Sequence, residues 1–334
     1  MKSEKLFDVL GLGVVAVDDL LYVSSFPASD TKVRATRGPR RCGGLTGAAL
    51  VAAARLGARS AYAGCLGTDE HSQHVASNFT TEGVDISHAP RLPAATVVHS
   101  TIIVAGDSGS RNVFFEDQGL IGAHDTLPPD EIICASQVLF IDHKGMKGNL
   151  RAARVARAAG VAVVADFEID ADPLFREVLS LVNHLVLSEE FACLITKESN
   201  AADAALRLWQ SNREVVIVTS GANGCWSVSP ENDAKPVHHP AFSVSATDTV
   251  GCGDVFHGAY SASLASGAAL QERIRFASAA AAINASRAEI PRLGAVREFL
   301  QAHPQTAVKK TAATAAAATG QSPSTPPAEK SLPT

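Results

Sequence analysis

The segment with the greatest potential for chemistry is Asp248-Thr249-Val250-Gly251-Cys252-Gly253-Asp254. Gly251 and Gly253 have no Cβ, so a ligand can approach the backbone closely there. Small and apolar residues at helical spacing follow Asp254, and the first N–H groups and the dipole of a helix attract an anion. A carboxylate beside such a site can remove a proton from an attacking hydroxyl. A tight turn capped by Asp254 is the simpler alternative, and the rest of the chain has to decide between them.

The length and composition of the chain are typical of a globular protein, whose strands and helices would position this segment. The chain has 334 residues, a formal net charge of -5, 46% hydrophobic residues and 19% charged residues. It lacks the basic excess of a nucleic-acid-binding protein and any apolar run that could span a bilayer, so we expect neither partner. The N-terminus is typical of a first strand and not of a signal peptide. The six cysteines are scattered without a Cys-x-x-Cys pair, which predicts reduced thiols and a cytoplasmic location.

Strands and helices alternate along most of the chain. Apolar stretches predict strands at residues 6–17, 60–66, 137–142, 161–166, 184–187 and 215–219. Helices are predicted at residues 48–57, 73–82, 150–159, 174–181 and 201–210, after Gly253, and at 273–286. Such alternation implies parallel βαβ units. The predicted fold class is therefore α/β, a doubly wound and mostly parallel sheet flanked by helices.

Two regions depart from this alternation. Extended pieces lie between residues 20 and 36, followed by an arginine-rich stretch at 37–41 that we interpret as a polar loop. Residues 95–116 predict a hairpin without a helical crossover. We expect these regions, about 14–40 and 95–117, to form a small β-sheet lid on a single domain spanning residues 1–302. Residues 303–334 are rich in Ala, Thr, Pro, Ser and Lys, which predicts a low-complexity, disordered tail.

Several predicted strands end in polar residues. These ends are Asp18-Asp19, Asp142-His143-Lys144, Asp166 and Thr219-Ser220-Gly221. In a doubly wound sheet the carboxyl ends of the strands line one edge, so the polar ends can meet in one crevice. The stretch from Thr219 to Gly224 can offer hydroxyl and backbone donors to a phosphate, with a plain glycine turn as the alternative. The sequence contains neither a P-loop nor the three-glycine dinucleotide fingerprint.

The order and spacing of these motifs resemble the ribokinase, or PfkB, family of carbohydrate kinases over roughly residues 6–300. Residues 248–254 match the family's C-terminal signature. Gly43-Gly44 with the Ala-rich helix that follows resembles the N-terminal signature, and residues 219–224 resemble the Thr-x-Gly-x-x-Gly nucleotide motif. The resemblance implies a ribokinase-like α/β domain with a β-sheet lid. It also implies phosphorylation of a sugar hydroxyl that depends on ATP and Mg²⁺.

The resemblance further implies roles for individual residues. Asp254 would be the catalytic base. The transferred phosphoryl group would be bound by the amides of Gly251, Cys252 and Gly253. The sugar would be bound by Asp18, Gly43, Gly44 and Lys144. The nucleotide would lie along Thr219, Gly221, Gly224, Asp248 and Thr249. Glu190, from the family's Asn-x-x-Glu motif, would act on Mg²⁺ through water.

The chain also departs from the family pattern. Leu187 stands where the Asn of Asn-x-x-Glu is expected, so metal handling can differ. Residues 45–48 replace the asparagine-bearing segment that ribokinases and ketohexokinases use toward the sugar. Residues 286–291 lack a frequent glycine pair, which leaves open whether K⁺ binds near Asp248. Cys252 replaces the more usual alanine, and we hypothesise that its thiol makes the enzyme sensitive to oxidation.

The resemblance leaves several substrates open. Residues 97–144 and 240–258 look closest to ketohexokinases and sulfofructose kinases, so we expect a ketose or a related anionic sugar such as fructose or sulfofructose. Lys144 and the lid cations would face the anion, with a solvated lid surface as the alternative. Ribokinase or nucleoside kinase activity is another candidate, and a non-catalytic sugar-binding regulator on the same scaffold is a third. A homodimer formed through the lid is a further expectation.

Overall fold

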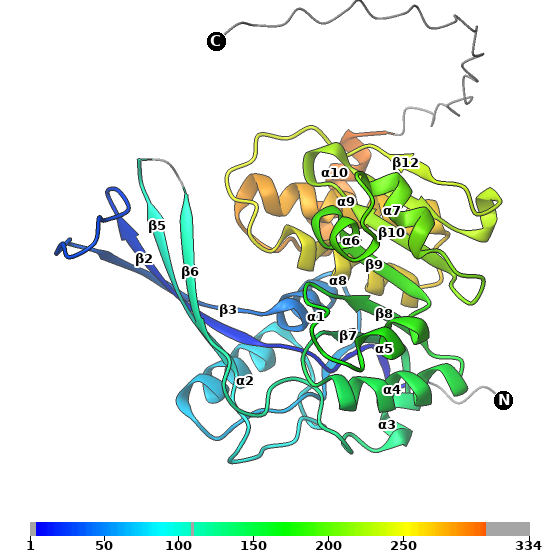
Figure 1. Cartoon of the computed structure of the whole chain (residues 1–334), viewed down its shortest axis with the longest axis horizontal. Coiled ribbons are helices and arrows are strands. Elements are labelled where there is room, and N and C mark those ends of the chain that lie inside the picture. Colours follow the sequence, from blue (N-terminus) through cyan, green and yellow to red (C-terminus); the bar gives the residue numbers. More distant parts are fainter. Residues whose placement is uncertain (1–4, 108–109, 305–334) are drawn as a thin grey trace, which may run out of the picture. The chain divides into compact units, whose positions relative to one another are not determined.

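A computed structural model describes residues 5–107 and 110–304 of the chain (Figure 1). The described residues up to His303 belong to one compact unit. They contain an eight-stranded sheet in the order β12-β11-β10-β9-β8-β7-β1-β4 and a separate four-stranded sheet in the order β3-β2-β5-β6. This arrangement confirms the predicted α/β class with a smaller separate sheet. The predicted tail lies outside the described residues from position 305 onward.

The large sheet is parallel except at one edge. Its parallel strands are β1 (Phe7–Gly11), β4 (Ser60–Tyr62), β7 (Ser136–Asp142), β8 (Ala162–Asp166), β9 (His184–Ser188) and β10 (Val215–Thr219). The antiparallel edge is made of β11 (Cys225–Val228) and β12 (Val237–His239). The inner parallel strands are buried on both faces, as strands of doubly wound sheets are. Their carboxyl ends share one edge, where Asp142 pairs with Asp166 and Ser188 pairs with Thr219.

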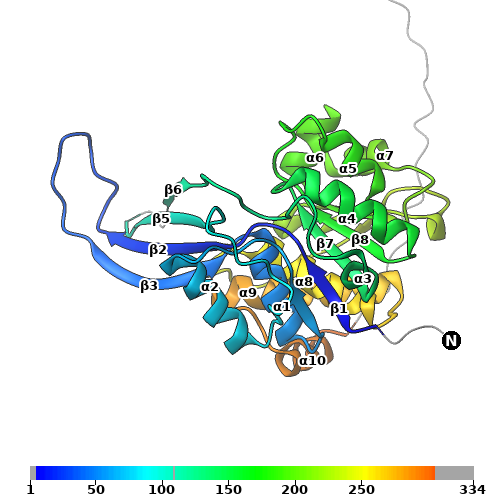
Figure 2. The same cartoon turned by 90° about the horizontal axis from the view of Figure 1, so that it is seen from below.

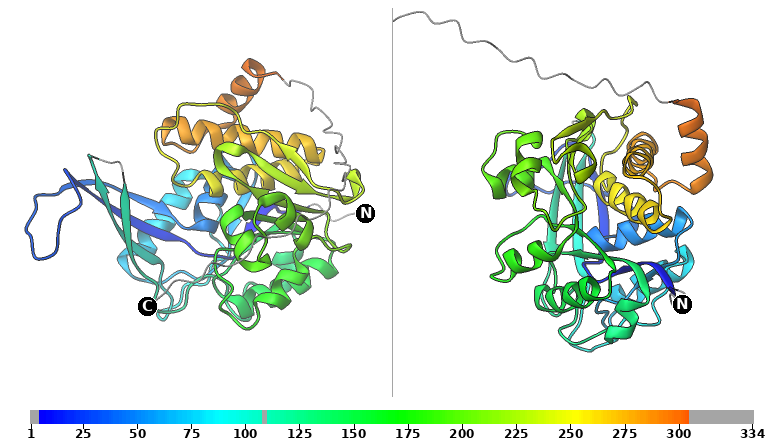
Figure 3. Two further views of the ribbon diagram at one scale, coloured as in Figure 1. Left: turned by 45° about the horizontal axis from the view of Figure 1, so that its top comes forward. Right: turned by 90° about the vertical axis from the view of Figure 1, so that its right-hand side faces the viewer.

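Helices cover both faces of the large sheet. One face packs against α1 (Leu45–Arg55), α2 (Glu70–Glu82), α8 (Cys252–Ala265), α9 (Leu270–Arg287) and α10 (Leu293–Ala302). The other face packs against α4 (Met146–Ala158), α5 (Phe175–Leu181), α6 (Glu189–Thr196) and α7 (Ala201–Leu208), with α3 (Asp130–Cys134) beside α4. In Figure 3 the green and the yellow-to-orange helices lie on opposite sides of the strands. No described helix has the length and apolar character needed to cross a membrane.

The small sheet consists of β2 (Ala16–Val23), β3 (Thr36–Gly43), β5 (Val98–Ala105) and β6 (Arg111–Glu116), which run side by side in Figure 2. The predicted strand at residues 6–17 is therefore wrong in its extent, because the chain leaves the large sheet at Gly11 and enters the small one at Ala16. Gly13 lies in this link. A Cβ on Gly13 would stand 2.0 Å from Asp142 Oδ2, so only glycine fits beside this buried carboxylate.

The interpretation of residues 37–41 as a polar loop is also wrong, because they lie within β3. Pro39 is compatible with a strand here because β3 is an edge strand that needs no second ladder partner. Arg40 is held by two hydrogen bonds of 2.9 Å to the carboxylate of Asp19 on β2. Ion pairing across neighbouring strands thus keeps a charged run in an extended conformation, which a count of charges alone does not reveal.

Candidate active site

The segment around Asp254 is the start of α8. Gly251 is the N-cap with φ 71°, a left-handed conformation that favours glycine, and no side chain caps the helix. Asp254 is the third residue of the helix. The alternative of a turn capped by Asp254 is therefore wrong. The peptide groups of Cys252, Gly253 and Asp254 instead lie in the first turn, where N–H groups lack an intrahelical partner and attract an anion. The Cys252 N–H makes a long contact of 3.4 Å with the Thr249 carbonyl oxygen.

The loop before α8 is anchored to the end of α9. The Asn284 side chain donates from Nδ2 to the Val250 carbonyl oxygen at 3.0 Å and to Cys252 Sγ at 3.3 Å. The amides of Thr247 and Asp248 donate to the Ala285 carbonyl oxygen at 2.7 and 3.1 Å. Sequence reasoning missed Asn284. The only signal was a buried polar residue in an alanine-rich helix, which points to a hydrogen-bonding partner but does not say which one.

The Asp254 carboxyl lies among other acidic groups below the helix start. Burial, and then the neighbouring Asp166, raise the pKa of Asp254 well above its ordinary value, and His257 opposes this rise. Burial likewise raises the pKa of Asp166, with contributions from Glu168 and Asp142. A carboxyl with a raised pKa is a stronger base once ionised, which suits proton removal from an alcohol.

Asp142 ends β7 but does not present a free carboxylate to the crevice. Its side chain is fully buried, and its Oδ2 accepts from the Val14 amide at 2.6 Å and from Thr46 Oγ1 at 2.7 Å. Its Oδ1 accepts from the Lys144 amide at 2.8 Å. The prediction that the polar strand ends meet at one edge is thus correct for Asp142 and Asp166, but Asp142 connects the β1–β2 link to α1.

The residues predicted to bind sugar occupy the junction between the two sheets. Asp18 lies on β2, where burial raises its pKa and a hydrogen bond from Ser100 lowers it. A Cβ on Gly43 would stand 2.5 Å from Asp18 Oδ2, so this glycine leaves room for the carboxylate. Gly44 is the N-cap of α1 with φ 86°. The resemblance names Asp18, Gly43 and Gly44 as sugar-binding residues, and in the structure these three residues lie close together at the start of β2 and α1.

Lys144 is not a free cation in this structure. Its Nζ donates to Asp117 Oδ2 at 2.6 Å, and this contact lowers the pKa of the Asp117 carboxyl. Two other cations from the small sheet lie nearer the Asp248 segment. Arg41 on β3 and Arg111 on β6 have guanidinium nitrogens 4.0 and 3.8 Å from the Asp248 carboxylate. They reduce the attraction of this carboxylate for K⁺, and sequence reasoning did not single out either contact.

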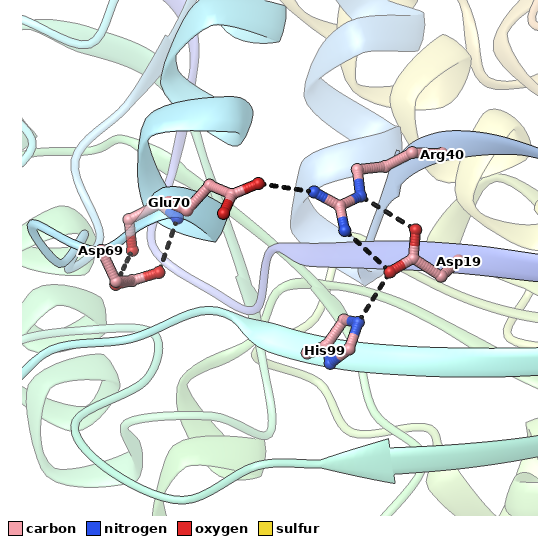
Figure 4. Close-up of polar contacts among 6 residues, drawn as sticks. Asp19, Arg40, Asp69, Glu70 and His99 are labelled. Carbon is pink, nitrogen blue, oxygen red and sulfur yellow. Dashed lines mark hydrogen bonds and ion pairs between the residues drawn. The ribbon is translucent and has the colours of Figure 1, made fainter.

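A second ionic cluster connects the small sheet to α2. Arg40 on β3 reaches Asp19 on β2 and donates from Nη1 to Glu70 Oε1 on α2 at 3.1 Å, while His99 on β5 lies 3.0 Å from Asp19 (Figure 4). The Arg40 and His99 contacts hold the pKa of Asp19 well below its usual range. The His99 ring stacks on that of His71 at a centroid distance of 4.3 Å. These contacts fix the base of the small sheet against the domain.

The predicted nucleotide segment follows β10. Thr219 ends the strand with its hydroxyl donating to the Leu187 carbonyl oxygen at 3.3 Å, and a short 3-10 turn covers Gly221–Asn223. Gly221 and Gly224 have φ 53° and 89°. A Cβ on Gly224 would stand 2.0 Å from the His239 carbonyl oxygen, so glycine is required there. The bare backbone leaves the face of this turn open to a ligand.

Glu190 lies beside this segment in the first turn of α6, with an exposed side chain. The α6 N-cap is Ser188, whose Oγ accepts from the Phe191 amide at 3.2 Å. Across residues 5–107 and 110–304, no group of three or more His, Cys, Asp or Glu side chains could hold a metal ion.

Comparison with known proteins decides the family. The profile of the pfkB family carbohydrate kinases matches residues 11–290. The chain belongs to this family. It is 29% identical over 301 residues to a ribokinase of Haemophilus influenzae, covering 87% of this chain and 97% of the relative. It is 28% identical over 277 residues to a probable fructokinase-4 of Arabidopsis thaliana, covering 73% of this chain and 82% of the relative.

Solved structures share the fold. An Escherichia coli protein assigned as ribokinase II, in complex with ATP and Mg²⁺, superposes with a TM-score of 0.73 at 21% identity, covering 88% of this chain and 99% of the other. The ribokinase-like architecture of the large and small sheets is thus shown. This chain is a carbohydrate kinase of the pfkB family.

Proposed function

We propose that this carbohydrate kinase transfers the γ-phosphoryl group of ATP to a hydroxyl of a ketose or related anionic sugar, with Asp254 as the base. The observation that carries the proposal is the position of Asp254 in the first turn of α8, three residues after the Gly251 N-cap. A single helix start then supplies both the carboxylate and the amides that attract the phosphoryl group.

In the proposed reaction the sugar hydroxyl attacks the γ-phosphorus and gives its proton to an Asp254 carboxylate oxygen. The new O–P bond forms as the bond to the β–γ bridging oxygen breaks, and ADP leaves with that electron pair. The amides of Gly251, Cys252 and Gly253 stabilise the charge on the transferring group. Mg²⁺, when bound to the phosphates, neutralises further charge. Asp18 and the backbone at Gly43 and Gly44 hold the sugar.

Two observations support the binding of ATP. The E. coli protein of the same fold is a complex with ATP and Mg²⁺, and this chain has a glycine-containing turn at Gly221–Asn223 after β10. We propose that Thr219, Gly221 and Gly224 lie along the nucleotide and that Glu190 orients water on Mg²⁺. We also propose that K⁺ binds near Asp248. Exchanging K⁺ for a bulky organic cation in a kinase assay tests whether the activity depends on K⁺.

The sugar class is the finer part of the proposal. The relatives are a ribokinase and a fructokinase, whereas Arg41 and Arg111 bring two cations against the single carboxylate of Asp248, and this excess of positive charge favours a substrate that carries an anionic group. A coupled ADP-release screen tests this over fructose, ribose, sugar acids, sulfofructose and adenosine. Preference for fructose or an anionic ketose supports the proposal. Preference for ribose or adenosine would reject the ketose and indicate a ribokinase or a nucleoside kinase. Sugar binding without ADP release would establish a non-catalytic regulator.

We also propose a homodimer formed through the small sheet. β6 is an exposed edge strand, and its Val113, Phe114 and Phe115 are 48, 55 and 62% exposed. An apolar edge of this kind is normally covered. Sedimentation equilibrium of the wild type and of Phe115→Glu tests the proposal. A wild-type dimer that the substitution dissociates supports it, and a monomeric wild type rejects it.

A reducing, cytoplasmic location completes the proposal. All six cysteines are free thiols in the structure, which is the pattern of proteins kept in a reducing compartment. Fractionation of the native host with compartment markers tests it. Recovery with a secreted or periplasmic marker would contradict it.

A further inference from the structure

His257, one turn after Asp254 in α8, is surrounded by acceptors. Its ring is 3% exposed. Nδ1 lies 2.8 Å from the Gly253 carbonyl oxygen and 3.3 Å from Asp166 Oδ2, and Nε2 lies 3.0 Å from the Val186 carbonyl oxygen. Carbonyl oxygens only accept hydrogen bonds, so a ring nitrogen that faces one must carry a proton to form a hydrogen bond with it.

The contact between His257 and the Val186 carbonyl takes the place of a hydrogen bond between strands of the large sheet. The parallel pairing of β8 with β9 ends at Ala165 and Leu185, so the Val186 carbonyl has no ladder partner on the β8 side. The His257 side chain enters at this point, against the edge of the Phe140 ring, and supplies the missing donor from Nε2. A bare Nε2 would leave a buried backbone carbonyl unpaired, which costs about 1–3 kcal/mol.

The Nδ1 contact requires a second proton on the same ring. A neutral imidazole has one N–H, so a proton on Nε2 would leave the lone pair of Nδ1 directed at the Gly253 carbonyl oxygen. Asp166 could instead be protonated and donate to Nδ1. That state leaves the shorter contact, to Gly253, repulsive. The Asp166–His257 pair therefore holds one proton more than a carboxylate and a neutral ring, and the geometry places it on Nδ1.

The titratable groups named around this pair are all carboxyl groups. Asp142 ends β7, Asp166 ends β8, Glu168 follows β8, and Asp254 lies on α8 itself. β9 contributes the Val186 carbonyl, and the remaining ring contact on α8 is with Phe256. One cation among these carboxyl groups lowers the electrostatic cost of ionising the base.

We propose that His257 is a doubly protonated positioning residue that holds the first turn of α8 and supplies positive charge beneath the Asp254 carboxylate. The Gly253 carbonyl belongs to the peptide whose N–H is that of Asp254. Donation from Nδ1 to this carbonyl fixes that peptide plane and with it the first turn of α8, which carries the amides of Cys252 and Gly253 and the Asp254 carboxylate. The catalytic part of this proposal rests on the proposed role of Asp254, whereas the protonation state does not.

The protonation state is tested by ¹⁵N NMR of the full chain labelled in its histidine rings, at about pH 7.5. His257 is expected to show two proton-bearing ring nitrogens, assigned by the signals absent in His257→Gln. His184 is the matched control, because it is also buried, its Nδ1 lies 2.9 Å from the Tyr260 hydroxyl, and burial lowers its pKa to about 3. Its ring is expected to be neutral. A neutral His257 ring would overturn the proposal whatever the enzyme's substrate.

Kinetics test the role of the charge. His257→Gln and His257→Asn each keep an amide donor without the charge, and each is expected to lower kcat about tenfold to hundredfold. Because His257 lowers the pKa of Asp254, its removal moves the acid limb of the kcat profile to higher pH. A purely structural histidine would lower kcat equally at all pH values, with the limb unmoved, and that result would overturn the role of the charge. If the kcat of the wild type does not fall at low pH, that result would instead reject Asp254 as the base.

Discussion

Asp142 provides a sharp test of how the two sheets are joined at the site. Its fully buried carboxylate accepts hydrogen bonds of 2.6, 2.7 and 2.8 Å from the Val14 amide, Thr46 Oγ1 and the Lys144 amide. Hydrogen bonds to a charged group contribute about 1.5–3 kcal/mol each. Because three donors in one network are not additive, Asp142→Ala is expected to lower the free energy of unfolding by about 4–6 kcal/mol.

The assay is urea unfolding near neutral pH, followed by tryptophan fluorescence. Asp142→Asn preserves the shape but turns one acceptor oxygen into an amide donor, so a loss of about 2–4 kcal/mol is expected. Asp130→Ala is the control, because its ion pair with Arg151 has an exposed carboxylate and is worth about 0–1 kcal/mol. If Asp142→Ala costs no more than the Asp130 control, the account of the β1–β2 link as a hydrogen-bonded junction is refuted.

Three further predictions concern the site. Gly224→Ala places a Cβ 2.0 Å from the His239 carbonyl oxygen at φ 89°, so it is expected to destabilise the fold by about 2–4 kcal/mol in thermal unfolding; a neutral effect would contradict the backbone path. Glu190→Gln is expected to raise the Mg²⁺ concentration required for half-maximal rate with little change at saturating Mg²⁺, and an unchanged requirement would remove Glu190 from the metal site. Because the pKa of Asp254 is raised and the base must be ionised, kcat is expected to fall with decreasing pH at values above 3.8, the ordinary pKa of aspartate; a flat profile would exclude a titrating base.

The fold class could be predicted because the patterns that mark strands and turns lie within short stretches of the sequence. An inner strand such as β7 (Ser136–Asp142) is buried on both faces, so it appears as a continuous apolar run that ends in a carboxylate. Glycines mark the backbone turns where only they fit, as at Gly44 and Gly224. These signals predicted the parallel sheet, whereas the sugar-side and nucleotide-side residues were named from the resemblance to the ribokinase family.

The partners of the site residues could not be predicted in the same way. Nothing in the neighbourhood of His257 in the sequence indicates Asp166 or Val186, since these contacts exist only once α8 packs on the strand ends. Asn284 and Arg41 also act through contacts between distant segments. The charged run at 37–41 was misread because its pairing with Asp19 lies on another strand. Long-range pairings of polar groups have no local signature in a single sequence.

The measurement that tests the central claim most directly is kcat and thermal stability of Asp254→Asn with the best sugar of the screen. Loss of the base is expected to lower kcat by about 10²–10⁴, or roughly 3–5.5 kcal/mol in the barrier. Burial raises the pKa of Asp254 in the folded state, so stability is lost as the pH rises from 3.8, the ordinary pKa of aspartate, to the raised pKa. The neutral asparagine removes this loss and is expected to keep or raise Tm near neutral pH. A correctly folded Asp254→Asn variant with wild-type kcat would contradict the account.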